Sequence, residues 1–133
     1  MTRIAQCACG SASISVNGEP RFHGVCHCTN CKRRTGSAFG VSAYFLRSDV
    51  TENTGDLVVY AFHHPTENYD QERHFCGKCG TTLFWYTSAR PHLIGIAAGC
   101  FPDESFGVPT ISGTSSKKLP WVELPSSCRL LER

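Results

Sequence analysis

Hydrophobic and polar residues alternate over several short stretches of the chain, a pattern typical of β-strands. Between residues 12 and 16, apolar residues at the even positions alternate with serines, and the Asn17-Gly18 pair that follows favours a turn. Four further apolar runs, rich in β-branched and aromatic residues, lie between turn-forming residues. They predict strands at residues 39–46, 57–62, 82–86 and 93–98.

Helical patterns are scarce by comparison. The clearest is a short helical turn over Thr29–Arg34, for which Thr29 is the expected N-cap. A length of 133 residues favours one domain, and the chain contains no repeat and no long linker. We therefore predict an all-β single domain over residues 1–133, with short helical turns and a metal staple.

Seven of the nine cysteines fall into three tight clusters, which indicates metal binding. In Cys7-Ala-Cys9, two thiols spaced like this on an extended chain point to one face. The pair Cys76-Gly-Lys-Cys79, followed by glycine, has the form of a zinc knuckle. The third cluster places three thiols within six residues, at Cys26, Cys28 and Cys31.

Disulfide bonds explain these cysteines less well than a metal does. Nine is an odd number, which does not suit a closed disulfide framework. The N-terminal sequence MTRIAQCACG has no apolar segment of the kind that directs secretion, and no apolar run approaches the roughly 20 residues of a membrane span. We therefore expect a cytoplasmic protein without a membrane partner, in a reducing compartment where structural disulfides are rare.

Spacing alone does not fix how the seven thiols divide between metals. Zinc takes four ligands in structural sites, and a catalytic zinc keeps three protein ligands and one open position. One division gives a closed site of Cys7, Cys9, Cys76 and Cys79 and an open site of Cys26, Cys28 and Cys31. The rival division joins Cys28 and Cys31 to Cys76 and Cys79, as in a zinc ribbon. It leaves three thiols without a site, so the first division, with two Zn²⁺ per chain, is preferred.

The remaining chemistry-bearing residues are assigned more simply. His27 lies between two cysteines of the trio and is expected to point away from the metal. Cys100 follows an apolar strand and suits a core position, whereas Cys128 lies in a polar tail and reads as an incidental thiol. The formal net charge of +2 is too small to favour nucleic acid as a partner.

Three segments, CACGS, CHCTNCKRRTGSAF and RHFCGKCGTTLF, resemble the glutathione-dependent formaldehyde-activating enzyme (Gfa-like) family. The resemblance covers a core of about residues 3–124. It implies a β-tent fold and two zinc ions: a structural one at Cys7, Cys9, Cys76 and Cys79, and a substrate-facing one at Cys26, Cys28 and Cys31. It also implies a carbon–sulfur lyase-type activity that joins glutathione and formaldehyde as S-hydroxymethylglutathione.

The basic run Lys32-Arg33-Arg34 has two possible roles, and the chain as a whole has three possible functions. Arg33 and Arg34 either bind the carboxylates of a glutathione-like thiol or form a solvated basic turn. The chain is either a zinc enzyme acting on a thiol–aldehyde adduct or a non-catalytic zinc-binding module for a protein or peptide. A nucleic-acid-binding zinc ribbon fits least, because basic residues are few and scattered. An unsaturated three-thiol site favours the enzyme, since a binding module has no need of one.

Overall fold

The computed structural model describes residues 1–102 and 104–132 and consists of two β-sheets with little helix. The small sheet has the order β1-β2-β5, and the large sheet has the order β11-β10-β3-β4-β9-β8-β7-β6. All strand pairs are antiparallel except those of β10, which runs parallel to β3 and β11. Strands make up 44% of the chain and helix 12%, so the predicted all-β class is confirmed. The strands are β1 (Thr2–Gln6), β2 (Ser13–Asn17), β3 (Phe22–Cys26), β4 (Gly40–Leu46), β5 (Val50–Thr54), β6 (Leu57–His63), β7 (Asp70–Cys76), β8 (Thr82–Thr87), β9 (Leu93–Ala97), β10 (Ile111–Gly113) and β11 (Arg129–Leu130).

The five strands predicted from the pattern all form, with ends displaced by one residue at most. They are β2, β4, β6, β8 and β9. The turn expected after β2 is present, and Gly18 adopts a left-handed backbone with φ of 80° that glycine tolerates without strain.

The predicted helical turn is α1 (Thr29–Thr35), but its expected N-cap was wrong by one residue. Cys28 is the capping residue: its Sγ accepts a hydrogen bond from the backbone N–H of Cys31 at 3.3 Å. Thr29 is therefore the first helical residue. The helix ends at Gly36, which has the left-handed φ of 63° common at helix C-termini. Short 3₁₀ turns follow elsewhere at η1 (Arg47–Asp49), η2 (Ala98–Cys100) and η3 (Ser115–Lys117).

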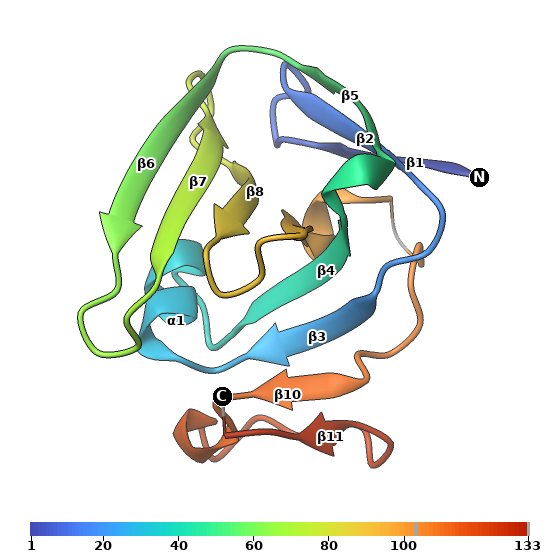
Figure 1. Ribbon diagram of the computed structural model, residues 1–133. Helices are drawn as coiled ribbons and strands as arrows, with labels where there is room; N and C mark the ends of the chain where they lie inside the picture. The colour runs from blue at the N-terminus through green and yellow to red at the C-terminus, as the bar shows by residue number, and fades with distance from the viewer. Residues whose placement is uncertain (103, 133) are drawn as a thin grey trace.

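The hydrophobic core lies where the small sheet packs on one face of the large sheet. Because alternate residues of a strand share a face, β4 contributes Ala43 and Phe45, and β9 contributes Ile94 and Ile96. All four are fully buried, as are the inward-facing residues of β2. The opposite face of the large sheet curves around α1 (Figure 1) and carries the polar and charged groups described below.

The segment after β10 packs against the large sheet instead of extending as a polar tail. Cys128, expected to be an incidental thiol, is only 7% exposed and just precedes β11 at the edge of the sheet. Its pKa is raised by burial, so it remains a neutral thiol. Within the described residues, no helix is long and apolar enough to cross a membrane.

Candidate metal centres

Four cysteines from distant parts of the chain meet where the small sheet adjoins the turn between β7 and β8. Cys7 and Cys9 follow β1, Cys76 ends β7, and Cys79 lies in the turn before β8. Their Sγ atoms all lie within 4.8 Å of one another. We call this group the quartet. It is the set that the preferred division of the thiols requires.

The quartet geometry matches a tetrahedral metal site with sulfur ligands. A zinc–sulfur bond of about 2.3 Å places the sulfurs of a regular tetrahedron about 3.8 Å apart. The Sγ atom of Cys9 lies 3.7 Å from that of Cys7 and 3.8 Å from that of Cys76. Such spacing is too long for a disulfide and equals that of sulfurs that share one tetrahedral metal ion. The group therefore has the spacing and donor chemistry to hold a metal ion.

Two hydroxyl groups that sequence reasoning missed support the quartet sulfurs. Ser11 Oγ lies 3.0 Å from Cys9 Sγ and 3.3 Å from Cys76 Sγ, and Thr81 Oγ1 lies 3.2 Å from Cys79 Sγ. The hydrogen bond from Ser11 lowers the pKa of Cys76 to about 7, and that from Thr81 lowers the pKa of Cys79 to about 5. Both shifts favour the thiolate, which is the form that binds metals.

A repeated sequence signal could have found these hydroxyls. Each follows the second cysteine of its pair by two residues, in Cys9-Gly10-Ser11 and Cys79-Gly80-Thr81. Both intervening glycines have left-handed backbones, with φ of 78° and 81°. The glycine turns the chain back so that the hydroxyl meets the sulfur.

The second group, which we call the trio, is Cys26, Cys28 and Cys31, whose Sγ atoms also lie within 4.8 Å of one another. Cys26 ends β3, Cys28 caps α1, and Cys31 lies in its first turn, so a strand end and a helix start bring them together. All three are half-buried. Among the described residues, no fourth histidine, cysteine or carboxylate belongs to this group. The quartet and the trio are separate, so the arrangement differs from the zinc-ribbon division.

The trio sulfurs are close enough to compete for protons. Hydrogen bonds from the thiols of Cys26 and Cys31 hold the pKa of Cys28 far below its usual range. The pKa of Cys31 is raised because its proton is shared with the other two sulfurs and because it is buried. Without a metal the three sulfurs share protons, and a cation that replaced those protons would stabilise all three as thiolates. The trio therefore also has the donor set of a metal site.

His27 points away from the trio, as its position between two cysteines predicted. Its ring is fully buried, and its Nε2 lies 3.0 Å from Ser112 Oγ on β10. Ser112 Oγ in turn lies 3.0 Å from the hydroxyl of Ser115. This chain of contacts ties the end of β3 to β10, which fixes the backbone that carries Cys26 and Cys28.

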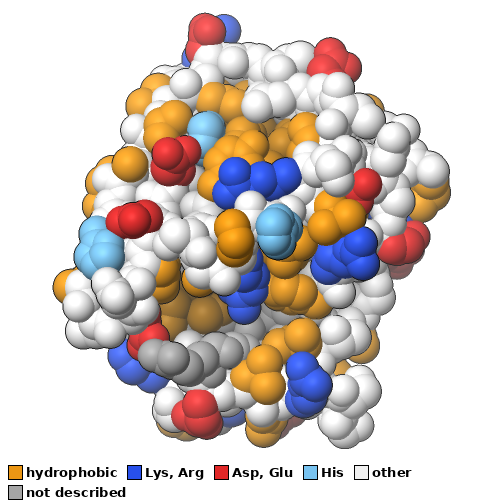
Figure 2. All heavy atoms as spheres, viewed as in Figure 1, with side chains coloured by type: hydrophobic (Ala, Val, Ile, Leu, Met, Phe, Trp, Pro, Cys, Tyr) orange, Lys and Arg blue, Asp and Glu red, His pale blue; other side chains and the backbone are white. Residues whose placement is uncertain are grey.

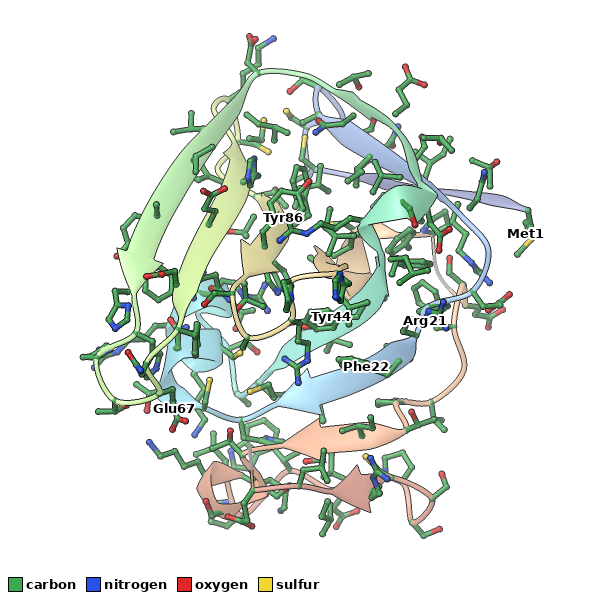
Figure 3. All side chains as sticks on the ribbon, in the orientation of Figure 1. Met1, Arg21, Phe22, Tyr44, Glu67 and Tyr86 are labelled. Atoms are coloured by element: carbon green, nitrogen blue, oxygen red, sulfur yellow. The ribbon has the colours of Figure 1, made fainter. Side chains whose placement is uncertain are left out.

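A row of aromatic and cationic residues crosses the face of the large sheet that surrounds α1. Residues directly opposite one another in antiparallel strands share a face, so the register defines the row. From β3 to β6 its members are Phe22, Tyr44, Gly95, Trp85, Arg73 and Tyr60. Phe22 and Tyr44 lie side by side (Figure 3), with ring centroids 4.6 Å apart. Gly95 leaves space that the Trp85 indole fills, and that indole donates a hydrogen bond to the Tyr44 hydroxyl at 2.9 Å.

Arg34 joins this row to the trio. Its Cζ lies 4.2 Å from the centroid of the Trp85 ring, a cation–π contact. A Cβ at Gly40 would lie 2.5 Å from Arg34 Nη2 and 3.3 Å from the Cβ of Cys31, so guanidinium and cysteine meet across that glycine. Arg34 Nη2 is buried and has no hydrogen-bond partner among the described residues. The positive charge beside Cys31 favours thiolates in the trio.

The two arginines of the basic run occupy different surroundings. Arg34 is half-buried, whereas Arg33 is exposed. Both line a cavity of about 390 Å³ together with Arg73, Tyr60 and Thr82. Figure 2 shows Lys and Arg side chains set among hydrophobic ones on the viewed face of the molecule. Arg73 comes from β7 and was not predicted as a site residue.

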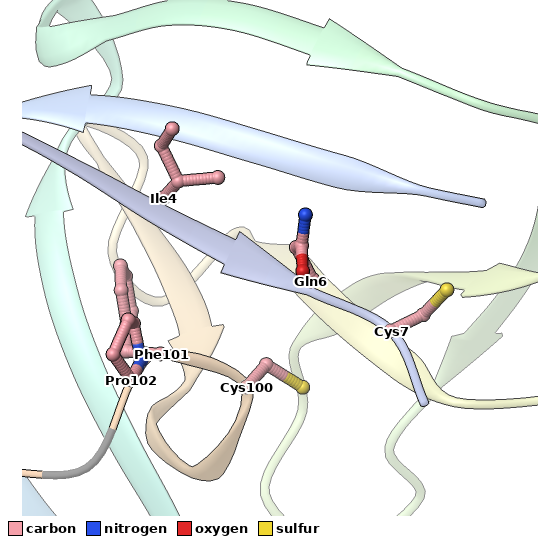
Figure 4. Close-up of a pocket in the computed structure, with 6 residues that line it drawn as sticks. All are labelled: Ile4, Gln6, Cys7, Cys100, Phe101 and Pro102. Carbon is pink, nitrogen blue, oxygen red and sulfur yellow. The ribbon is translucent and has the colours of Figure 1, made fainter. Parts of the chain in front are cut away.

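Cys100 lies beside the quartet but outside it. It packs against the hydrophobic core, as expected for a core position. It also lines a cavity of about 410 Å³ in which Ile4, Phe101 and Pro102 lie at one end and the thiols of Cys7 and Cys100 at the other (Figure 4). Burial raises the pKa of Cys100, so it stays a neutral thiol.

Comparison with known proteins agrees with this arrangement. A crystal structure of a Rhodobacter sphaeroides protein has a similar fold, with a TM-score of 0.59, 23% sequence identity, and coverage of 78% of this chain and 90% of that one. Among curated proteins, no sequence matches the chain significantly. The family model for the glutathione-dependent formaldehyde-activating enzyme matches residues 2–113, a region that contains both cysteine groups. The chain therefore belongs to the glutathione-dependent formaldehyde-activating enzyme (GFA) family.

Proposed function

We propose that the protein is a zinc-dependent enzyme of the carbon–sulfur lyase type that acts on a thiol–aldehyde adduct. Its reaction would join glutathione, or a related thiol, to formaldehyde as S-hydroxymethylglutathione. The observation that carries the proposal is the contrast between a quartet of four thiols and a trio of three. Four thiols complete a tetrahedral zinc site, whereas three leave the open position that a substrate can enter.

The chemistry requires a thiol to add to a carbonyl group. A sulfur–carbon bond forms, the carbonyl π bond breaks, and the thiol proton ends on the former carbonyl oxygen. A zinc ion held by Cys26, Cys28 and Cys31 would supply a Lewis acid and would favour the thiolate form of a bound thiol. A free thiol has a pKa of about 8.5, so little of it is thiolate at neutral pH without such help.

The surroundings of the trio support this role. Three thiolates around Zn²⁺ carry a net negative charge, which weakens a Lewis acid and repels an anionic substrate. Arg34 and Cys31 both border Gly40, and the guanidinium charge there would offset that of the trio. Arg33 and Arg34 line the adjacent cavity, where they would bind carboxylates of glutathione through charge-assisted hydrogen bonds. The charge that would offset the trio and the two arginines that would bind carboxylates therefore come from the same helix, α1.

The test measures thiol entry and turnover separately. Cobalt(II) replaces zinc in the protein, and glutathione entering the open position should change its visible absorption spectrum. With the zinc protein, S-hydroxymethylglutathione should form faster than the spontaneous reaction, which is measured and subtracted. Cys28→Ser should abolish both effects. Cys100→Ser, which removes a thiol outside both groups, should leave them intact. A wild-type protein that shows neither effect at millimolar glutathione refutes the proposal.

The alternative is a non-catalytic zinc module that binds a protein or peptide. One observation favours it: β6 is an edge strand of the large sheet, and Val58, Val59 and Tyr60 on it are 46%, 49% and 53% exposed. An exposed edge strand can pair with an added strand from a partner. Retained zinc without thiol entry in the cobalt experiment would favour this reading.

A further inference from the structure

The cavity between α1 and β7 gathers three arginines without any acidic partner. Arg33, Arg34 and Arg73 line it, and no carboxylate is among its lining residues. The ion pairs Arg3–Glu19, His63–Asp70 and His74–Glu72 lie elsewhere. Its volume of about 390 Å³ falls in the range of small-molecule sites.

The charges in this cavity repel one another in the unliganded protein. Burial lowers the pKa of Arg73, and the neighbouring charge of Arg34 lowers it further. The trio cysteine Cys31 offsets part of this charge when it is ionised. An anionic ligand in the cavity would offset the remainder and so stabilise the arrangement.

The guanidinium groups are also held in fixed orientations. The Cζ of Arg34 lies 4.2 Å from the Trp85 ring centroid, and the Cζ of Arg73 lies 4.9 Å from the Phe62 ring centroid. Arg73 Nε donates to Gln71 Oε1 at 2.9 Å, and its Nη2 donates to Asn30 Oδ1 at 2.6 Å. These two bonds engage Nε and Nη2, so Nη1 is the nitrogen that would meet a ligand. A guanidinium fixed in this way loses little entropy when it binds a planar oxyanion.

We propose that Arg34 and Arg73 form a carboxylate subsite and that Arg73 is the residue that determines selectivity for an anionic thiol. This inference rests on the proposed function, because it assigns the carboxylate end of the thiol whose sulfur enters the trio. Arg73 is linked to the trio through Asn30, which sits between Thr29 and Cys31 on α1 and also donates to the Tyr69 hydroxyl at 3.3 Å. Arg33 is the exposed arginine of the three and adds its charge to the attraction of the same anion.

Fluorescence of Trp85 reports directly on this subsite, because Arg34 lies on its ring. The experiment uses the zinc-loaded full chain with Trp121→Phe, which removes the second tryptophan, itself 70% exposed. The probe is glutarate, a dicarboxylate without a thiol, titrated at constant ionic strength against chloride. We expect a saturable change in Trp85 fluorescence with glutarate and no change with neutral glutaramide.

Variants identify the residue responsible. Arg73→Gln should weaken glutarate binding at least about tenfold, as expected for losing a charge-assisted hydrogen bond. Arg73→Lys, which keeps the charge, should not restore it, because an ammonium lacks the planar guanidinium that Gln71 and Asn30 hold in place. Arg129→Gln, on β11 at the edge of the sheet, is the matched control and should bind like the parent. If Arg73→Gln fails to fold, the glutarate affinity of Arg73→Lys is compared with that of the parent instead.

The outcomes separate the two proposals. No saturable glutarate signal, or unchanged affinity in both Arg73 variants, overturns the carboxylate subsite whether or not glutathione enters the cobalt shell. Glutarate binding that depends on Arg73, together with no thiol entry, overturns the proposed function and leaves the subsite standing.

Discussion

Replacing Cys76 by alanine removes a ligand from the junction of the two sheets. Cys76 is only 1% exposed, and its Sγ lies 3.8 Å from that of Cys9, which is 67 residues away in the sequence. It also lies within hydrogen-bond distance of Ser11 Oγ and the backbone N–H of Lys78. The substitution therefore removes one of the four thiols of the proposed zinc site, and it removes a hydrogen-bond partner of Ser11 Oγ and the Lys78 N–H.

The expected loss is comparable with the stability of the whole domain. A structural zinc site in small domains contributes about 10–16 kcal/mol at neutral pH. Folded domains as a whole are stable by only about 5–15 kcal/mol. Losing the quartet zinc would therefore remove most or all of the margin, and we expect Cys76→Ala to lose cooperative folding.

Zinc content and thermal unfolding test this reasoning together. Wild-type protein purified without chelator should hold about two zinc ions, and Cys76→Ala at most one, without a cooperative transition in circular dichroism. The matched variant is Cys28→Ser, which should also lose one zinc but keep its melting temperature within a few degrees. Serine preserves the N-cap of α1, and the trio joins only neighbouring elements of the large sheet. If Cys76→Ala melts like wild type, the structural role of the quartet is wrong.

Three further predictions concern groups around these sites. Ser11→Ala should weaken zinc binding at the quartet by about 10–100-fold, because ligand-supporting hydrogen bonds are lost; chelator competition measures this. Gly95→Ala should destabilise the protein by about 1–3 kcal/mol in urea unfolding, because a Cβ there overlaps the Trp85 indole, whereas Gly107→Ala, with open space, should not. Burial lowers the pKa of His23, so the unfolded chain binds its proton more readily, and stability should fall as pH drops below about 6.5. His23→Gln should flatten that slope in zinc-saturated unfolding titrations.

The sequence revealed strands that alternate or run apolar and concealed strands of mixed residue type. β2 alternates, β9 runs apolar, and both contribute residues to the core. β7 reads DQERHFC and was missed, because Arg73 lines the cavity on one face while His74 stacks on Phe84 on the other, with ring centroids 4.5 Å apart. β10 has three residues, too few for a period to appear.

The candidate site divides in the same way. Thiols two or three residues apart must lie close together, so local spacing was enough to find the clusters. The partnership of Arg34 with Arg73 depends on the placement of α1 beside β7, and the row through Trp85 depends on strand register. Neither can be read from spacing, because the residues are far apart in the sequence and their types are common on solvated surfaces.

The two thiol groups differ in what holds them together, and this difference argues for a division of roles. The quartet joins segments of two different sheets, so a zinc ion there would tie the two sheets together. The trio is positioned by contacts that need no metal: β3 pairs with β4 and β10, His27 is anchored to Ser112, and Cys28 caps α1. A site preformed in this way can gain, lose or exchange a fourth ligand without unfolding the domain. Open coordination is therefore tolerable at the trio, whereas at the quartet it would compromise the fold.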